Sequence, residues 1–368
     1  MKILFAMFDG GGNVPPQLGV AKELRRRGAE VVVIGHDGLR GRVELAGFAF
    51  EPFSAGRPFD PTLTRSLAAM MIDFTRVASD RQLGRIVIDA AHRHGADAVI
   101  MDMVLVTAIA EVVESSLPTV VFVHYFYRAY QDMAAGPVGW ALRLRGTDPL
   151  AAEHRGVAHI VSARADLDPV RGTPAVCHSG VVWQGHPCVT RPAPTPRVLI
   201  SLSTNGFAGQ RRMLQHILDA VAPLPVDATV TVGPSIDATG LRVPPNADVY
   251  PWLDHDEVLA TTSLVIGHGG HSTAMRALSF SVPQIVLPAN PLIDQRTVGA
   301  ALARAGAGVL LPKHAGAHKI RSVVETVLGE SAYYRAADRL GEDIRRVNGA
   351  VTAADVVCAV ARRQAGAP

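Results

Sequence analysis

Short apolar runs alternate with longer amphipathic segments along most of the chain. Runs such as 3–7, 31–34 and 98–101 have the length and the β-branched content of buried strands. Between the runs, apolar residues recur at helical spacing. Pro15 and Pro16 suit the first turn of such a helix, because the N–H groups of that turn have no partner within the helix and proline lacks this group. Alternating strands and helices predict parallel sheets with helices on both faces.

One proline-rich segment interrupts this alternation. Residues 186–197 contain four prolines, which exclude a helix or a central strand and predict a semi-rigid linker. The sequence therefore predicts two doubly wound, Rossmann-like α/β domains, 1–185 and 198–345, and a helical tail over 346–368. Ligands of such sheets bind at the carboxyl ends of the strands, and two facing sheets make a cleft.

The composition excludes several classes of protein. A chain of 368 residues is long for one core, and 48% hydrophobic with 19% charged residues excludes disorder over most of the length. A net charge of +3 is too small for a nucleic-acid-binding surface. The three cysteines lack a Cys-x-x-Cys pair, and no uncharged apolar stretch reaches 18 residues. We expect a cytoplasmic monomer or homodimer without nucleic-acid or membrane partners.

The segment with the most chemical content is 264–295. A strand at 264–266 runs into the Gly/His-rich stretch 267–271, and a helix is predicted to begin at Ser272, its N-cap. Glycines let the backbone approach a ligand, and a helix N-terminus attracts phosphate or diphosphate. The alternatives are a glycine-rich turn without a ligand and a nucleophile elbow at 270–274, which the residues between the strand and Ser272 disfavour.

The same segment resembles the donor-binding signature of family 1 glycosyltransferases of the GT-B fold. Their pattern H-G-G-x-x-[ST], V-P, L-P and D-Q appears here at 268–273, 282–283, 287–288 and 294–295. The two-domain plan and the linker extend the resemblance over nearly the whole chain, and the bacterial branch that glycosylates antibiotic aglycones fits best. The resemblance implies an inverting hexosyltransferase without metal or cofactor. It would transfer a sugar from a nucleotide donor to a small hydrophobic natural product. The resemblance favours a dTDP-deoxysugar as the donor over a UDP-hexose.

The resemblance also implies roles at the donor site. His268 and the following N–H groups would hold the diphosphate, Asp294 and Gln295 would bind the sugar, and Trp252 would stack on the base unless it is an ordinary half-buried aromatic. The implied donor-binding residues are Ser203, Thr204, Trp252, Leu253, His268, Gly269, Gly270, Ser272, Thr273, Asp294 and Gln295.

The N-terminal half departs from the family at the catalytic base. Members usually carry G-H-x-x-P, whereas here Asn13 takes the position of the His. A carboxamide has no basic lone pair near neutral pH. Three explanations stay open: Asp102, at the family's acidic position, is the base directly or through water; His124 reaches the same site; or the acceptor needs little help. The ordinary alternatives are a strand-end cap for Asp102 and a loop histidine for His124.

Two segments, 53–71 and 125–140, are predicted to shape the acceptor pocket, with core packing as the alternative. The predicted acceptor-binding residues are Phe59, Met70, Tyr125, Phe126 and Trp140. The missing His leaves two other functions open. One is a non-catalytic or auxiliary protein that binds sugar nucleotide, and the other is a nucleotide-sugar 2-epimerase, against which the D-Q pair argues.

Overall fold

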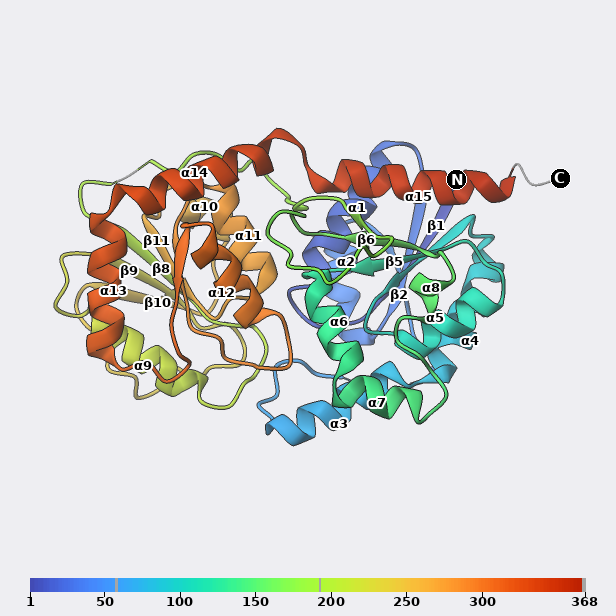
Figure 1. Cartoon of the computed structure of the whole chain (residues 1–368), viewed down its shortest axis with the longest axis horizontal. Coiled ribbons are helices and arrows are strands. Elements are labelled where there is room, and N and C mark those ends of the chain that lie inside the picture. Colours follow the sequence, from blue (N-terminus) through green and yellow to red (C-terminus); the bar gives the residue numbers. More distant parts are fainter. Residues whose placement is uncertain (57–58, 192, 366–368) are drawn as a thin grey trace. The chain divides into compact units, whose positions relative to one another are not determined.

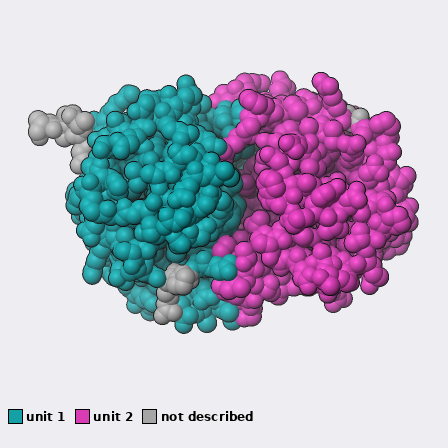
Figure 2. All heavy atoms as spheres, turned by 180° about the vertical axis from the view of Figure 1, so that it is seen from behind, with its two compact units in different colours: residues 1–60, 67–183, 348–368 teal, residues 61–66, 184–347 magenta. Residues whose placement is uncertain are grey.

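The computed structural model describes residues 1–56, 59–191 and 193–365. It divides into two compact units, each built around one parallel sheet (Figures 1 and 2). Unit 1 comprises residues 1–60, 67–183 and 348–368, and unit 2 comprises residues 61–66 and 184–347. The predicted fold class, two doubly wound Rossmann-like domains, is confirmed.

Unit 1 contains a seven-stranded sheet in the order β3-β2-β1-β4-β5-β6-β7, with all neighbours parallel. Its central strands are apolar and almost wholly buried, because helices cover both faces of a parallel sheet. The strands are β1 (Lys2–Met7), β2 (Glu30–Gly35), β3 (Ala49–Pro52), β4 (Ala98–Asp102), β5 (Thr119–Val123), β6 (Ala158–Val161) and β7 (Cys177–His178). The helices are α1 (Val14–Arg26), η1 (Asp37–Leu39), α2 (Arg40–Leu45), α3 (Leu67–Ala78), α4 (Arg81–His94), α5 (Val106–Glu114), α6 (Tyr127–Ala135), α7 (Pro137–Arg143), α8 (Ala151–His154) and α15 (Gly349–Ala365).

Unit 2 contains a six-stranded parallel sheet in the order β10-β9-β8-β11-β12-β13. Because β8 pairs with β11, the loops that follow these two strands leave the same edge of the sheet side by side. The strands are β8 (Arg197–Ser201), β9 (Asp227–Thr231), β10 (Ala247–Tyr250), β11 (Leu264–Gly267), β12 (Gln284–Val286) and β13 (Gly308–Leu310). The helices are α9 (Gln210–Val221), α10 (His255–Leu259), α11 (His271–Ser279), α12 (Gln295–Arg304), α13 (Ala317–Gly329) and α14 (Ser331–Arg346).

The C-terminal helices divide between the two units. Helix α14 belongs to unit 2, whereas α15 packs beside α1 on the sheet of unit 1 and contributes buried Ala353 and Val357 to its core. Gly349, the first residue of α15, packs closely against the loop after β7, because a Cβ there would lie 2.4 Å from the Gly180 carbonyl oxygen. The predicted tail over 346–368 is therefore not a separate part of the fold, and its last three residues lie outside the described ranges.

The unit boundary falls earlier than the sequence placed it, between Trp183 and Gln184. In the predicted linker, residues 186–191 and 193–196 form neither helix nor strand, and Pro192 lies outside the described residues. A short segment of the N-terminal half, Pro61–Ser66, belongs to unit 2, which the sequence did not indicate.

Candidate functional site

Asp102, the last residue of β4, is the centre of a buried polar cluster in unit 1. Its Oδ2 accepts hydrogen bonds from Asn13 Nδ2 at 2.8 Å and from Gln17 Nε2 at 2.7 Å. Its Oδ1 accepts one from Val104 N at 2.9 Å. All three partners are N–H donors, so the carboxyl group is held as an acceptor. Two predicted catalytic residues, Asn13 and Asp102, are thus in direct contact.

The amide of Asn13 is fully used by the protein. Besides Asp102, its Nδ2 donates to the Phe8 carbonyl at 2.7 Å, and its Oδ1 accepts from Gly10 N at 2.9 Å. Asn13 stands before α1, yet its side chain does not cap that helix. It instead ties the loop after β1 to the end of β4. This arrangement suits a positioning residue and not a proton acceptor.

His124, directly after β5, completes the cluster. Its Nδ1 is buried and lies 3.4 Å from Asp102 Oδ2, without hydrogen-bond geometry. The His124 side chain is 13% exposed, whereas Asp102 is wholly buried and Asn13 is 2% exposed. Of the three candidates, His124 therefore combines a basic ring nitrogen with access to a ligand.

Gln17 is a member of this cluster that sequence reasoning missed. It is fully buried one turn after Asn13 on α1, and its Nε2 also approaches the Asn13 carbonyl at 3.1 Å. The available signal was its i, i+4 spacing from Asn13, which places both amides on one face of the helix.

Aromatic side chains border the cluster. The rings of Phe59 and Phe8 pack with centroids 4.8 Å apart, and Tyr125 lies edge-on to His124 at 4.8 Å. Phe8 is next to the polar cluster, because a Cβ at Gly10 would meet both the Phe8 ring and Asn13 Oδ1 at 3.1 Å. The structure thus brings two predicted acceptor residues to the border of this cluster, Tyr125 beside His124 and Phe59 beside Phe8.

The other predicted acceptor residues are more varied in their surroundings. Phe126 is fully buried in unit 1, which agrees with the core-packing alternative. Met70 is half-buried on α3, and Trp140 on α7 is 63% exposed. Contact of these side chains with an acceptor stays a prediction.

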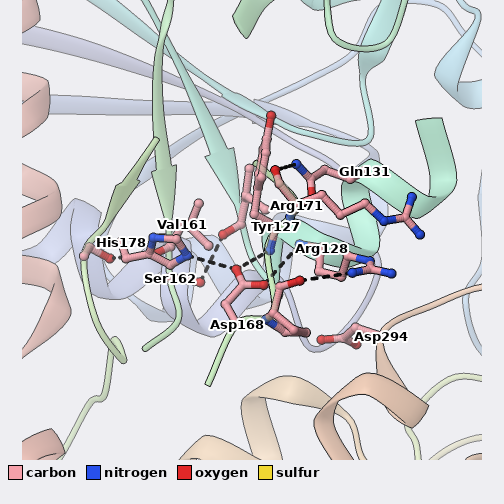
Figure 3. A network of polar contacts seen from close by, with 12 residues as sticks. Tyr127, Arg128, Gln131, Val161, Ser162, Asp168, Arg171, His178 and Asp294 are labelled. Carbon is pink, nitrogen blue, oxygen red and sulfur yellow. Dashed lines mark hydrogen bonds and ion pairs between the residues drawn. The ribbon is translucent and has the colours of Figure 1, made fainter. Parts of the chain in front are cut away.

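Asp168 fixes the start of α6, just after His124 and Tyr125 in the chain (Figure 3). Its carboxylate accepts from Tyr127 N at 2.7 Å and from Arg128 N at 3.1 Å, and it lies 2.9 Å from His178 Nε2. A carboxylate at a helix N-terminus is stabilised by the helix dipole. Asp168 and His178 carried no sequence signal, because the loop that holds Asp168 is 40 residues from the helix that it caps.

The strongest candidate ligand site of unit 2 lies at the carboxyl ends of β8 and β11. Ser201, the last residue of β8, pairs with Gly267, the last residue of β11, so the loops after these two strands begin side by side at the same edge of the sheet. A pocket at this edge is lined chiefly by residues of the predicted donor motif and its neighbours, namely Ser201, Gly267, His268, Gly269, Gly270 and Thr273.

Gly269 and Gly270, two of the glycines that line this pocket, are required for different structural reasons. Gly269 has a φ of +82°, and a Cβ there would lie 2.6 Å from Val286 Cγ1. Gly270 lies under the imidazole of His268, and a Cβ would approach its Nε2 to 2.5 Å. Helix α11 begins at His271 with Gly270 at the N-cap position. The prediction of Ser272 as N-cap was wrong, because extended Gly270 already turns the chain into the helix.

His268 is buried and neutral. Burial lowers the pKa of its imidazole to about 4, against the opposing effects of a hydrogen bond to the Ser201 backbone and the charge of Asp294. Its Nδ1 is enclosed and has no hydrogen-bond partner among the described residues. An orphaned buried nitrogen costs about 1–3 kcal/mol, and a hydrogen bond with a bound ligand would satisfy it.

Asp294 and Gln295 close the other side of the motif. Asp294 Oδ2 lies 3.2 Å from His271 Nδ1, in the first turn of α11. Gln295 Oε1 accepts from Ala289 N at 2.7 Å and from Asn290 N at 2.8 Å, whereas its Nε2 is buried without a partner in the described part of the chain. Gln295 therefore shapes the loop after β12, and the predicted sugar contact of this pair stays a prediction.

The remaining predicted donor residues lie on two loops of unit 2. Ser203 is buried and its hydroxyl accepts from Asn205 N at 2.9 Å, while Thr204 beside it is exposed. Trp252, after β10, is 72% exposed, and Leu253 is half-buried. An exposed indole is available for stacking on a base.

Within the described ranges, no three His, Cys, Asp or Glu side chains gather as metal ligands would. No helix in those ranges combines the length and apolarity needed to cross a bilayer.

Comparison with known proteins agrees with this geometry. Residues 215–352 match the family model described as Erythromycin biosynthesis protein CIII-like, C-terminal domain. A PGL/p-HBAD biosynthesis glycosyltransferase of Mycobacterium tuberculosis is 37% identical over 150 residues, which are 40% of this chain and 34% of that protein. The chain thus spans about a third of the length of that relative. The elloramycin glycosyltransferase ElmGT of Streptomyces olivaceus is 28% identical over 94% of both chains.

Solved structures extend the likeness over both units. The spinosyn rhamnosyltransferase SpnG, solved with thymidine diphosphate, superposes with a TM-score of 0.74 over 97% of this chain and 100% of that chain, at 21% identity. The chain has the GT-B fold. The predicted resemblance to glycosyltransferases of antibiotic and natural-product pathways is confirmed.

Proposed function

We propose that this GT-B protein is a metal-independent, inverting glycosyltransferase. It would transfer a sugar, in our proposal a deoxysugar, from a nucleoside diphosphate to a small hydrophobic natural product. The observation that carries the proposal is the orphaned, neutral His268 over Gly270 at the start of α11. The names of the relatives support sugar transfer, and the thymidine diphosphate in SpnG supports a dTDP-linked donor.

On the donor side, the features of α11 suit a diphosphate. Its N-cap is a glycine, so no side chain competes with a ligand for the first turn, and the helix dipole favours negative charge there. Neutral His268 adds one hydrogen-bonding ring nitrogen beside the N–H groups of this turn without carrying a buried charge. Fixed donors of this kind stabilise the charge that develops on the leaving diphosphate.

On the acceptor side, we assign the proton to His124. The acceptor hydroxyl would give its proton to the outer ring nitrogen, Nε2, while its oxygen attacks the anomeric carbon and the bond from that carbon to the phosphate oxygen breaks. The buried carboxylate of Asp102, 3.4 Å from Nδ1, would stabilise the imidazolium that forms. Asn13 would serve by holding Asp102.

One observation favours a second function, a sugar-nucleotide-binding protein without transfer. The amide of Asn13 occupies the family's base position and is fully engaged by Asp102, Phe8 and Gly10. Such a protein would bind the donor and leave it intact.

Incubation with a panel of dTDP- and UDP-sugars, read as release of nucleoside diphosphate with and without phenolic and aliphatic aglycones, tests the proposal. We expect turnover in wild type and a loss of about 10²-fold or more in kcat/KM for His268→Ala. His318→Ala, at an exposed histidine of α13, is the matched control. Tight nucleotide binding without release in any mixture would favour the second function.

A further inference from the structure

A six-residue segment of the N-terminal half packs within unit 2. β3 ends at Pro52 and α3 begins at Leu67, both in unit 1, but Pro61–Ser66 between them belong to unit 2. We call residues 61–66 the strap.

The strap packs against the loop that follows β8. Gly206 N donates a hydrogen bond to the Pro61 carbonyl at 2.9 Å, and Arg65 forms a parallel β-bridge with Phe207. Phe207 is buried, at 5% exposure. The contact is therefore made by backbone at both ends of the strap.

Gly206 makes this contact possible. A Cβ at this position would lie 2.5 Å from the Thr62 carbonyl oxygen, 2.6 Å from Thr64 N and 2.7 Å from the Leu63 carbonyl carbon. These are backbone atoms, so none can rotate away as a side chain would. The φ of Gly206 is not in the left-handed region, and close approach alone accounts for the glycine.

The opposite side of the same loop is fixed by its own unit. The Ser203 carbonyl accepts from Ser235 Oγ at 3.1 Å, and Phe207 N donates to Gln210 Oε1 at 2.7 Å. The loop is thus held between the strap, α9 and the turn after β9. It carries Ser203 and Thr204, which are predicted to face the donor phosphates.

We infer that the strap positions this loop for the diphosphate of the donor, and that Gly206 is a positioning residue for nucleoside diphosphate binding. The inference rests on the proposed function. A loop that is already ordered loses less conformational entropy when it binds a ligand, so its affinity is higher. Phe59, at the candidate acceptor site, lies two residues before the strap. Donor affinity would then depend on a segment anchored in the unit that carries the candidate base.

The test uses the full chain and three variants. Gly206→Ala adds a methyl group where the strap backbone approaches the loop. Replacement of residues 61–66 by a glycine-serine hexapeptide makes the strap flexible and leaves Gly206 in place. Gly329→Ala is the matched control, because an added methyl at that glycine would have no atom within 4 Å. The dissociation constants of dTDP and UDP are measured by calorimetry, and amide hydrogen exchange of residues 203–209 is measured without nucleotide.

We expect nucleotide binding about ten-fold weaker in Gly206→Ala and in the strap replacement, with no change in Gly329→Ala. A protein that carries both Gly206→Ala and the strap replacement should bind no more weakly than either variant alone, because both changes remove the same contact between the strap and the loop after β8. Amide exchange at 203–209 should be faster in both. The strap replacement keeps the test valid if Gly206→Ala does not fold.

Wild-type affinity together with wild-type exchange in the strap replacement would overturn the inference. Failure of the wild-type protein to bind either nucleotide would instead count against the proposed function. The exchange data would then decide separately whether the strap orders the loop.

Discussion

His124 Nδ1 lies 3.4 Å from Asp102 Oδ2, and two amide groups already donate to that same oxygen. This relationship changes the choice of base. By motif position Asp102 was the nearest candidate, but a wholly buried carboxylate that accepts three hydrogen bonds has no surface for an acceptor. The imidazole of His124 lies next to this carboxylate and is itself partly exposed.

His124→Ala should therefore lower kcat by about 10²–10⁴-fold, the usual worth of general-base help, without changing nucleotide affinity. Asp102→Asn should lower kcat less, because the imidazole remains. Steady-state kinetics on one acceptor, with His92→Ala at an exposed histidine of α4 as control, measure both. Full activity in His124→Ala with a loss in Asp102→Asn would return the role of base to Asp102.

Acid should destabilise the protein through His268. Burial lowers the pKa of this residue from 6.5 to about 4. Between these values the unfolded chain binds a proton that the native state does not, so the free energy of unfolding falls as pH drops from 6.5 to 4, by about 3 kcal/mol at most. Urea unfolding at several pH values should show a smaller fall in His268→Gln than in wild type. An equal fall in both proteins, and in the exposed control His318→Gln, would contradict this role.

Activity should persist in excess EDTA. The first turn of α11 supplies N–H donors and positive potential for a diphosphate, the role that a divalent cation has in other transferases, and the unpartnered Nδ1 of His268 lies beside it. Nucleoside diphosphate release is measured with EDTA and after addition of Mg²⁺. Loss with EDTA that Mg²⁺ restores would refute metal independence.

Asp168→Ala should affect acceptor use more than donor use. The change leaves the first N–H groups of α6, at Tyr127 and Arg128, without their acceptor and should cost about 1–2 kcal/mol of stability. We expect a raised acceptor KM with unchanged dTDP affinity. Asp132→Ala, an exposed partner of Arg128 within α6, is the control. Equal kinetics in the two variants would show that α6 does not bear on the acceptor.

The sequence predicted most of the fold because buried parallel strands such as β1, β4 and β11 are continuous apolar runs. It missed β3, β6, β7 and β10. These strands are short. Three of them, β3, β7 and β10, are edge strands, where burial is partial and the apolar signal is weak, and β6 lies next to the edge strand β7.

The candidate site was predictable where a motif holds adjacent residues, as at His268 and Gly270. The site was not predictable where its residues come from distant parts of the sequence and meet only in the folded sheet. Asp168 acts through contacts with residues far along the chain, and nothing in its own neighbourhood reports them. Gln17 also contacts a distant residue, Asp102, and its only local signal was the i, i+4 spacing from Asn13. The neutrality of His268 also follows from burial, which the motif does not encode.

The return of α15 to unit 1 has a practical consequence for dissecting the molecule. A gene fragment that stops after Trp183 would lack Ala353 and Val357 and would expose the apolar face of the sheet that they cover. Residues 1–60 and helix α15 both belong to unit 1, so residues 184–347 of unit 2 are an insertion in its sequence, and the strap is a second, short insertion. Circular permutation, with the ends joined and new ends opened at 183/184, would turn unit 1 into one continuous stretch apart from the strap. Removing residues 184–347 from that rearranged gene would leave unit 1 with α15 in place, which truncation after Trp183 does not.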